Sequence, residues 1–291
     1  MLKTRNIIIL SGNGMMGNTI LKYLSIKSKL KVFYTIRRNN SQKFNKNYLI
    51  IKDIYKKNNF LKLKKFLYLN KISLIINCSG ITKHENINLQ KKYSSKINSL
   101  LNHKLSKIKN IKLLILSSDC IFNGISGNYS EKNTSYSNDI YGKTKRKGEI
   151  KYLKNVITFR SSGIGHEINT KKGLLEWFLN KKTKKIYGYK NVFFTGPTTL
   201  ELAKIIYKYV IYEKIKYGLF HVGTKKISKY AILSIINKIY KKQINIIANY
   251  NIKINRTLNC NKFIKKTNYL SPSWMNLIKE TKLFNEKFSK K

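Results

Sequence analysis

The amino-acid sequence predicts an α/β fold built on a doubly wound, Rossmann-like parallel sheet, with a smaller C-terminal region. Two observations lead to this prediction. Short, continuously apolar runs alternate with helical patterns over the first 160 residues, and a glycine-rich turn follows the first run, at 6–10. Uninterrupted apolar strands are typical of parallel sheets that carry helices on both faces. Right-handed crossovers between such strands place ligands at the carboxyl ends of the strands.

The first half of the chain holds the regular part of this alternation. Strands are expected where apolar runs lie between turn residues, at 6–10, 30–36, 47–54, 72–80, 111–119 and 156–160. Helices are expected where apolar residues recur at helical spacing, from about Asn18 to residue 27, at 58–70, at about 89–109 and from about Tyr141 to Leu153.

Beyond residue 160 the alternation becomes looser. We expect helices at 173–179, 198–211 and 229–240, a strand at 218–223, and an irregular segment followed by a short helix at the C-terminal end. The expected organisation is a dinucleotide-binding domain at 1–160 and a mainly substrate-binding region at 161–291. Roughly 190–223 is expected to pack back on the first sheet. A length of 291 residues is enough for two domains.

The sequence argues against several classes of protein. A membrane span needs about 20 apolar residues, and the runs IIIL at 7–10 and LLIL at 113–116 have only four each. The N-terminal segment leads directly into the first strand and predicts no signal peptide. The four histidines lack the spacing of metal ligands, so no metal site is expected. Three widely spaced cysteines favour a reducing compartment and therefore the cytoplasm, at Cys78, Cys120 and Cys260.

The chain is very basic, with 60 Lys and Arg against 12 Asp and Glu and a net charge of +48. Such a charge ordinarily suggests a nucleic-acid partner. However, only six of the basic residues are Arg, the residue that nucleic-acid readers favour. Residues with A/T-rich codons are abundant and Ala and Pro are scarce, which indicates a mutational bias. We therefore expect no nucleic-acid partner, although the field can steer an anionic substrate.

The glycine-rich turn SGNGMMG predicts a dinucleotide site. It stands between a strand and a helix, and Gly12, Gly14 and Gly17 have GxGxxG spacing. Glycines there let the backbone approach a pyrophosphate at the helix N-terminus. Ser11 occupies the first position of the alternative GxxGxxG register, and its Cβ comes close to the pyrophosphate. The candidate cofactor contacts in this turn are Ser11, Gly12, Gly14, Met15, Met16 and Gly17.

The end of the second strand bears on the choice of cofactor. NAD sites usually have an acidic residue there, whereas the 2′-phosphate of NADP suits Arg. This strand end has no acid but carries Arg37 and Arg38, which favours NADP(H) and leaves NAD(H) open. Asp53 follows the third strand and is either an adenine contact or an N-cap.

Tyr141 and Lys145 form a Y-x-x-x-K pair, and Ser118 ends the fifth strand. Residues at i and i+4 of a helix share a face, so the phenol and the ammonium can converge on one ligand. Free tyrosine has a pKa of about 10, and a nearby ammonium favours the phenolate. The three residues are candidate catalytic groups for reduction of a carbonyl.

The surrounding motifs resemble one family. SSDCIFNGISGNYSEKN followed by DIYGKTKRKGE is similar to the corresponding segment of dTDP-4-dehydrorhamnose reductases, which are extended short-chain dehydrogenases/reductases. NCSGITK at 77–83, FRSSGIGHE at 159–167, GPTTLELA at 196–203 and the region of Arg256 match in the same order. The usual Thr is replaced by Ser118, which keeps the hydroxyl.

The resemblance implies hydride transfer from NADPH to the C4 ketone of a nucleotide-diphospho-4-keto-6-deoxy sugar, for polysaccharide precursors. Ser118 and Tyr141 would contact the ketone, and Tyr141 would donate the proton. Lys145 would lower the pKa of Tyr141 and hold the nicotinamide ribose, and Asn98 would support Lys145 through water. The resemblance places further residues along the cofactor cleft, Asn77, Cys78 and Ser79, and at the substrate, Gly163, His166 and Arg256.

Other candidates are weaker. Lys83 is placed to meet a phosphate, Asp119 either orients a hydroxyl or belongs to a turn, and Trp177 either flanks the sugar or lies in the core. An epimerase or dehydratase of the same fold with tightly held NAD stays open. So do a non-catalytic nucleotide-sugar-binding subunit and a homodimer.

Overall fold

The computed structural model describes residues 5–38, 44–168 and 170–289. Its centre is a seven-stranded sheet in the order β3-β2-β1-β4-β5-β6-β9, with every neighbouring pair parallel. The predicted doubly wound α/β class is confirmed. The strands of this sheet are β1 (Arg5–Leu10), β2 (Leu30–Ile36), β3 (Tyr48–Ile50), β4 (Leu74–Asn77), β5 (Lys112–Leu116), β6 (Val156–Arg160) and β9 (Gly218–His221).

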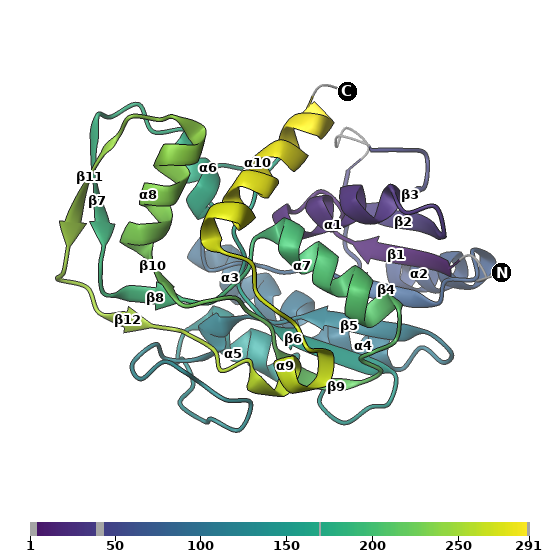
Figure 1. Cartoon of the computed structure of the whole chain (residues 1–291). Coiled ribbons are helices and arrows are strands. Elements are labelled where there is room, and N and C mark those ends of the chain that lie inside the picture. Colours follow the sequence, from purple (N-terminus) through teal and green to yellow (C-terminus); the bar gives the residue numbers. More distant parts are fainter. Residues whose placement is uncertain (1–4, 39–43, 169, 290–291) are drawn as a thin grey trace.

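Helices cover both faces of this sheet (Figure 1). The alternation of side chains along a strand sends Ile7 and Ile9 to one face and Ile8 and Leu10 to the other. The first face packs against α1 (Met15–Ser25), α7 (Thr199–Ile205), the π-helical segment η3 (Ile206–Ile211) and α9 (Asn261–Thr267). The second packs against α2 (Lys57–Leu69) and α4 (Leu101–Ser106).

The helix expected at about 89–109 is divided in the structure. It consists of α3 (Ile87–Ser94), the π-helical segment η1 (Ser95–Leu100) and α4. The helix expected from Tyr141 to Leu153 is shorter, because α5 (Ile140–Lys147) ends before Gly148. The helix after the glycine turn starts earlier than Asn18, at Met15.

The C-terminal part adds two small sheets, β10-β8-β12 and β11-β7, beside the large one (Figure 1). A separate apolar cluster joins them to three helices, as in the burial of Phe178, Ile236 and Leu277. The elements are α6 (Leu174–Leu179), β7 (Lys185–Tyr189), β8 (Val192–Phe194), β10 (Ile227–Ser228), α8 (Lys229–Tyr240), β11 (Asn245–Asn249), β12 (Ile254–Asn255) and α10 (Trp274–Ser289).

The sequence did not predict the small strands or α9, and the expectation of a short C-terminal helix was wrong. The strands have only two to five residues, and exposed residues alternate with buried ones along β7. Helix α10 has 16 residues and packs against α7 and α8. Within the described residues, no helix combines the length and the apolar character that a membrane crossing requires.

Candidate active site

The glycine-rich turn joins β1 to α1 through very close backbone contacts. A Cβ on Gly17 would lie 2.2 Å from the carbonyl oxygen of Ser11, and one on Gly12 would lie 2.8 Å from the ring of Tyr34. Neither position accepts a side chain. Ser11 itself has a φ of 60°, in the left-handed region, and its hydroxyl lies 2.9 Å from that of Ser79.

This turn suits the phosphates of a dinucleotide. Helix α1 has no side-chain cap at its N-terminus, so its first N–H groups are available to an anion. The side-chain amide nitrogen of Asn13 is buried without a hydrogen-bond partner among the described residues, and a phosphate oxygen would satisfy it. The turn lies at the carboxyl edge between β1 and β4, where the strand order reverses and such folds bind ligands.

The residues expected at the adenosine follow β2 and β3, the last two strands on this side of the sheet. Arg37 and Arg38 are exposed directly after β2. Asp53 is half-buried and forms an ion pair with Lys56, at 3.2 Å. Asp53 does not cap α2, because the N-cap residue is Lys56, so that alternative was wrong.

The expected catalytic residues meet at the carboxyl end of β5. Helix α5 is capped by Asp139, which accepts a 2.6 Å hydrogen bond from the N–H of Gly142. The Ser118 hydroxyl donates to Oδ1 of Asp119 at 3.2 Å and lowers the pKa of the Tyr141 phenol. The ammonium of Lys145, one helical turn after Tyr141, donates a 2.6 Å hydrogen bond to the carbonyl of Leu116.

Burial controls the proton affinities of this group. It raises the pKa of Tyr141, the charge of Cys120 acts in the same direction, and the hydrogen bond from Ser118 opposes them. Burial also lowers the pKa of Lys145 to about 8. Desolvation dominates the pKa of Tyr141 in this structure, and the ammonium of Lys145 binds a backbone carbonyl. That Lys145 lowers the pKa of Tyr141 stays a prediction. The phenol keeps its proton at neutral pH.

The loop after β4 lies between the turn and these residues. The amide of Asn98 accepts from the N–H of Ile81 at 2.9 Å and donates to its carbonyl at 3.0 Å and to Oγ1 of Thr144 at 3.1 Å. A Cβ on Gly80 would lie 3.5 Å from Oδ1 of Asn98 and 3.7 Å from Nζ of Lys145. Asn98 and Lys145 thus flank one point of the loop. Burial raises the pKa of the neighbouring Cys78 thiol to about 12, so it stays protonated.

Three cations gather on the other side of Ser118, and we call Lys83, Lys229 and Arg256 the basic cluster. Nζ of Lys83 lies 3.7 Å from the sulfur of Cys120, and Nε of Arg256 donates to the carbonyl of Phe122 at 3.3 Å. Burial lowers the pKa of Lys229 to about 8, while the charge of Asp119 raises it. The sequence did not single out Lys229, because nothing distinguishes it from the many other lysines.

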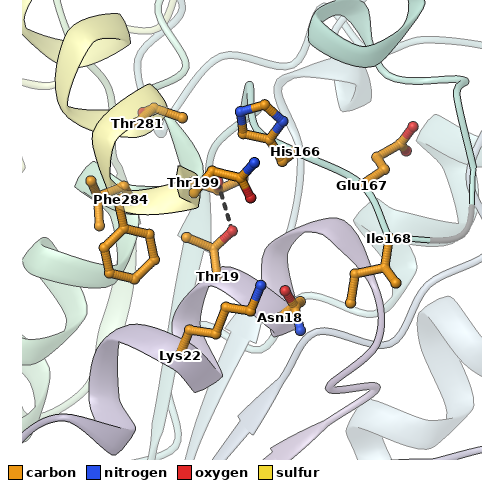
Figure 2. A pocket seen from close by; sticks show the side chains of 11 residues that line it. Asn18, Thr19, Lys22, His166, Glu167, Ile168, Thr199, Thr281 and Phe284 are labelled. Atoms are coloured by element: carbon orange, nitrogen blue, oxygen red, sulfur yellow. Dashed lines mark hydrogen bonds between the residues drawn. The ribbon is translucent and has the colours of Figure 1, made fainter. Parts of the chain in front are cut away.

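Some predicted substrate residues lie elsewhere. Both ring nitrogens of His166 are engaged, at 2.6 Å from Oε1 of Glu176 and 2.8 Å from the hydroxyl of Tyr240. Figure 2 shows His166 lining a small pocket together with Lys22 of α1. Trp177 packs on the C-terminal apolar cluster.

Gly163 faces the dinucleotide turn. A Cβ added to it would lie 2.2 Å from the methyl carbon of Met16. The structure therefore brings Gly163 to the start of α1, whereas Lys83, Asp119 and Arg256 lie near Ser118.

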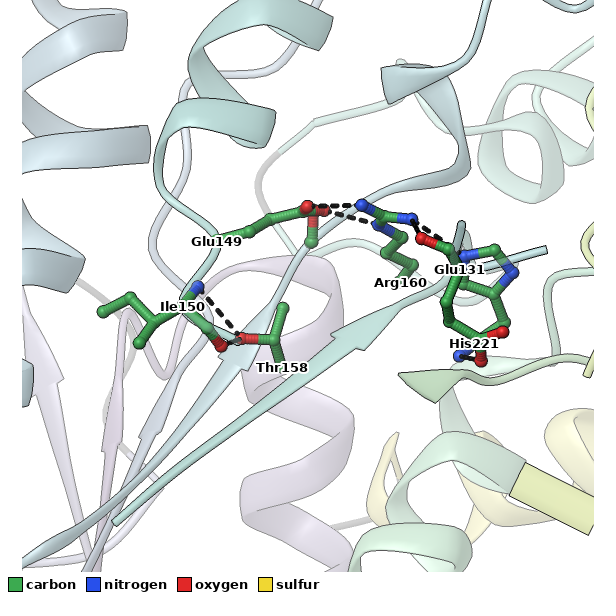
Figure 3. Close-up of polar contacts among 7 residues, drawn as sticks. Glu131, Glu149, Ile150, Thr158, Arg160 and His221 are labelled. Carbon is green, nitrogen blue, oxygen red and sulfur yellow. Dashed lines mark hydrogen bonds and ion pairs between the residues drawn. The ribbon is translucent and has the colours of Figure 1, made fainter. Parts of the chain in front are cut away.

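A buried ion pair between Glu149 and Arg160 is connected to the end of β5. Glu149 and Arg160 face each other through two hydrogen bonds of 2.8 and 2.7 Å, and their side chains are 1% and 0% exposed (Figure 3). Ser117, next to Ser118, donates to Glu149 at 2.7 Å.

Burial and the charge of Arg160 lower the pKa of His221 to about 3. Its neutral ring therefore accepts a hydrogen bond from Arg160 and donates one to the carbonyl of Tyr129.

The model of the RmlD substrate binding domain matches residues 5–281. The chain belongs to this family. The match confirms the resemblance that the motifs indicated. No curated protein sequence matches the chain.

Several solved structures share the fold of this chain. A dTDP-4-dehydrorhamnose reductase from Clostridium acetobutylicum has a TM-score of 0.76 and 21% identity over 97% of this chain and 99% of its own. One from Bacillus anthracis, in complex with NADP, has a TM-score of 0.76 and 18% identity over 96% and 99%. A dTDP-glucose 4,6-dehydratase from Bacillus anthracis, in complex with NAD, has a TM-score of 0.74 and 18% identity over 98% of both chains.

Removing one member of the buried ion pair should cost stability. Glu149→Leu leaves the Arg160 guanidinium buried without its carboxylate, and we expect a loss of about 3–5 kcal/mol in the free energy of unfolding. Arg160→Met should lose a similar amount, and the double variant less than the sum. Urea unfolding of the four proteins measures this coupling, and strictly additive losses would contradict it.

Proposed function

We propose that the protein is an NADPH-dependent reductase of the C4 ketone of a nucleotide-diphospho-4-keto-6-deoxy sugar, working in the cytoplasm on polysaccharide precursors. The observation that carries the proposal is the group at the end of β5. Ser118 acts there on the phenol of Tyr141, whose pKa it lowers, and Lys145 stands one helical turn further on with its ammonium on the carbonyl of Leu116. Membership of the family and the fold shared with nucleotide-sugar oxidoreductases support the enzyme class.

The residues have separate roles in this reaction. NADPH, when bound at the glycine turn, supplies the hydride. Ser118 holds the carbonyl oxygen of the substrate, and Tyr141 gives its phenolic proton to that oxygen, so that the ketone becomes a hydroxyl. The raised pKa keeps the proton on Tyr141 until charge develops on the oxygen. Lys145 would hold the nicotinamide ribose of the bound dinucleotide.

The basic cluster suits the diphosphate of the substrate. Three cations face one carboxylate, Asp119, so the cluster has an excess positive charge of two, the usual charge of a diphosphate bridge. Lys229 is also the first residue of α8, where the helix dipole favours an anion. The strongly positive chain would draw such a substrate from a distance.

A nucleotide-sugar epimerase or dehydratase is the second candidate, because the similar fold of the dTDP-glucose 4,6-dehydratase holds NAD. Such an enzyme would purify with its dinucleotide bound and show no net oxidation. The exposed Arg37 and Arg38, with no acid at the end of β2, support exchangeable NADPH instead.

The variant Tyr141→Phe tests the proposed mechanism. It removes the proton donor but keeps the ring, so we expect turnover to fall by about 10²-fold or more. Consumption of NADPH with dTDP-, UDP- and GDP-linked 4-keto sugars measures this, with NADPH affinity as the control. Turnover equal to that of the wild type would remove Tyr141 from the mechanism.

The preference for NADPH should depend on Arg37. In Arg37→Ala, we expect the affinity for NADPH to fall roughly tenfold, the usual scale of a charged hydrogen bond, and that for NADH to change little. Titration of each dinucleotide by fluorescence gives the two dissociation constants. An equal loss for both dinucleotides would contradict a contact with the 2′-phosphate.

Lys229 and Lys226 offer a matched comparison at the basic cluster. Their ammonium groups lie 4.4 Å and 4.2 Å from the rings of Phe194 and Phe193, but only Lys226 is exposed. We expect Lys229→Gln to weaken binding of a nucleoside diphosphate about tenfold and Lys226→Gln to leave it unchanged.

The same comparison has a pH dependence. Because the pKa of Lys229 is about 8, its positive charge is lost as the pH rises through that value. Wild-type affinity for the diphosphate should therefore decline above pH 8, and in Lys229→Gln this decline should be smaller. Calorimetry at several pH values measures both effects, and identical profiles for wild type and Lys229→Gln would exclude Lys229 from the site.

A further inference from the structure

Asn102 is a buried amide on α4, with 3% of its surface exposed, and it contacts the end of β4, the preceding turn of its own helix and the end of α5. Its Oδ1 accepts a 2.6 Å hydrogen bond from Nδ2 of Asn77. Its Nδ2 donates to the carbonyls of Asn98 at 3.2 Å and Gly148 at 3.0 Å. The acceptor and both donors of one carboxamide are therefore used, which fixes its orientation.

One of these contacts leads to the dinucleotide turn. Asn77 is the last residue of β4 and pairs with Leu10 of β1, at the edge where the strand order reverses. Its Oδ1 accepts from the N–H of Ser79 at 3.0 Å, and the hydroxyl of Ser79 lies 2.9 Å from that of Ser11. Asn102 is thus joined to the start of the glycine-rich turn through two intermediate residues.

The other two contacts lead to the catalytic helix. The N–H of Gly148 closes the last turn of α5 on the carbonyls of Thr144, at 3.2 Å, and Lys145, at 3.1 Å. A Cβ on Gly148 would lie only 1.9 Å from the carbonyl oxygen of Asn98. The end of α5 therefore sits directly on η1, and Asn102 binds both partners of that contact.

We propose that Asn102 is a positioning residue that keeps the dinucleotide turn and the catalytic helix α5 in a fixed relation. The inference rests on the proposed function, because the distance between the dinucleotide turn and α5 matters only if a cofactor and Tyr141 act on the same substrate. Hydride transfer requires the cofactor and the proton donor to meet the same carbonyl group, and small misplacements cost much of the rate. Asn102 lies outside the cleft and acts through Asn77, Asn98 and Gly148.

A purely structural role makes a different prediction. Removing the amide removes three hydrogen bonds, to Asn77, Asn98 and Gly148, so any role of Asn102 predicts lower stability. Asn237 provides a matched control. Its half-buried amide donates to the carbonyl of Ile244 at 2.8 Å and accepts from the N–H of the same residue at 3.1 Å, which joins α8 to the start of β11.

The test compares Asn102→Leu with Asn237→Leu at a temperature where both remain folded by circular dichroism. We expect both to melt at a lower temperature. Only Asn102→Leu should lose affinity for NADPH and turnover of the 4-keto sugar, each by about tenfold or more. Wild-type-like NADPH affinity and turnover in folded Asn102→Leu would overturn the proposal.

The variant Asn102→Asp separates the contact that leads to the dinucleotide turn from the contacts that lead to α5. The new carboxyl keeps the acceptor for Asn77 but places an oxygen opposite the carbonyls of Asn98 and Gly148. NADPH affinity should stay within about twofold of the wild type, while turnover falls by about tenfold and recovers as the pH is lowered, because the protonated carboxyl can donate again. Parallel losses of affinity and turnover with no pH recovery would contradict it.

NADPH affinity is measured without substrate, so the proposal can be judged separately from the reductase assignment. A wild type that binds NADPH but reduces none of the sugars refutes the assigned reaction. In that case the affinity of Asn102→Leu against that of Asn237→Leu still decides the positioning role. A wild type that binds neither NADPH nor NADH overturns both.

Discussion

The whole site depends on how closely α5 approaches the end of β5 and the segment η1. Two glycines allow this approach, since a Cβ on Gly142 would lie 2.6 Å from the carbonyl oxygen of Cys120 and one on Gly148 would lie 1.9 Å from that of Asn98. With any larger residue the helix would have to move outward. Tyr141 would then leave Ser118, and Lys145 would lose the carbonyl of Leu116. The same contact buries Lys145 and half-buries Tyr141, which explains why desolvation has the largest effect on both pKa values.

The sequence was most informative where one stretch of chain determines its own structure. The central strands are continuously apolar because they are buried on both faces, and their order along the chain identified the sheet. The C-terminal strands are short and half-exposed, so no local pattern distinguished them from loops. Helix α10 was underestimated because its buried apolar positions, Trp274, Leu277 and Ile278, lie at its start, and the rest of the helix is rich in charged and polar residues.

The same distinction applies to the site. Ser118, Tyr141 and Lys145 could be predicted to meet, because a strand end and a helical spacing fix them and their motif has a recognisable order. Lys229 and Asn102 could not, because their importance comes from contacts with distant segments and the chain is rich in Lys and Asn. The rise in the pKa of Tyr141 could not be predicted either, because a sequence shows which charges are present but not how strongly folding desolvates each group.

The left-handed backbone of Ser11 has a consequence for ligand recognition. A residue with a side chain costs roughly 1–2 kcal/mol in this conformation, whereas glycine adopts it freely. The bond to Ser79 offsets part of this cost. Together with the 2.9 Å hydrogen bond from the N–H of Ser11 to Oγ1 of Thr35, it anchors the loop to β2 and to the segment after β4. These contacts hold Ser11 in the same place with or without a dinucleotide. Little conformational entropy remains to be lost on association, and more of the contact energy is available as affinity.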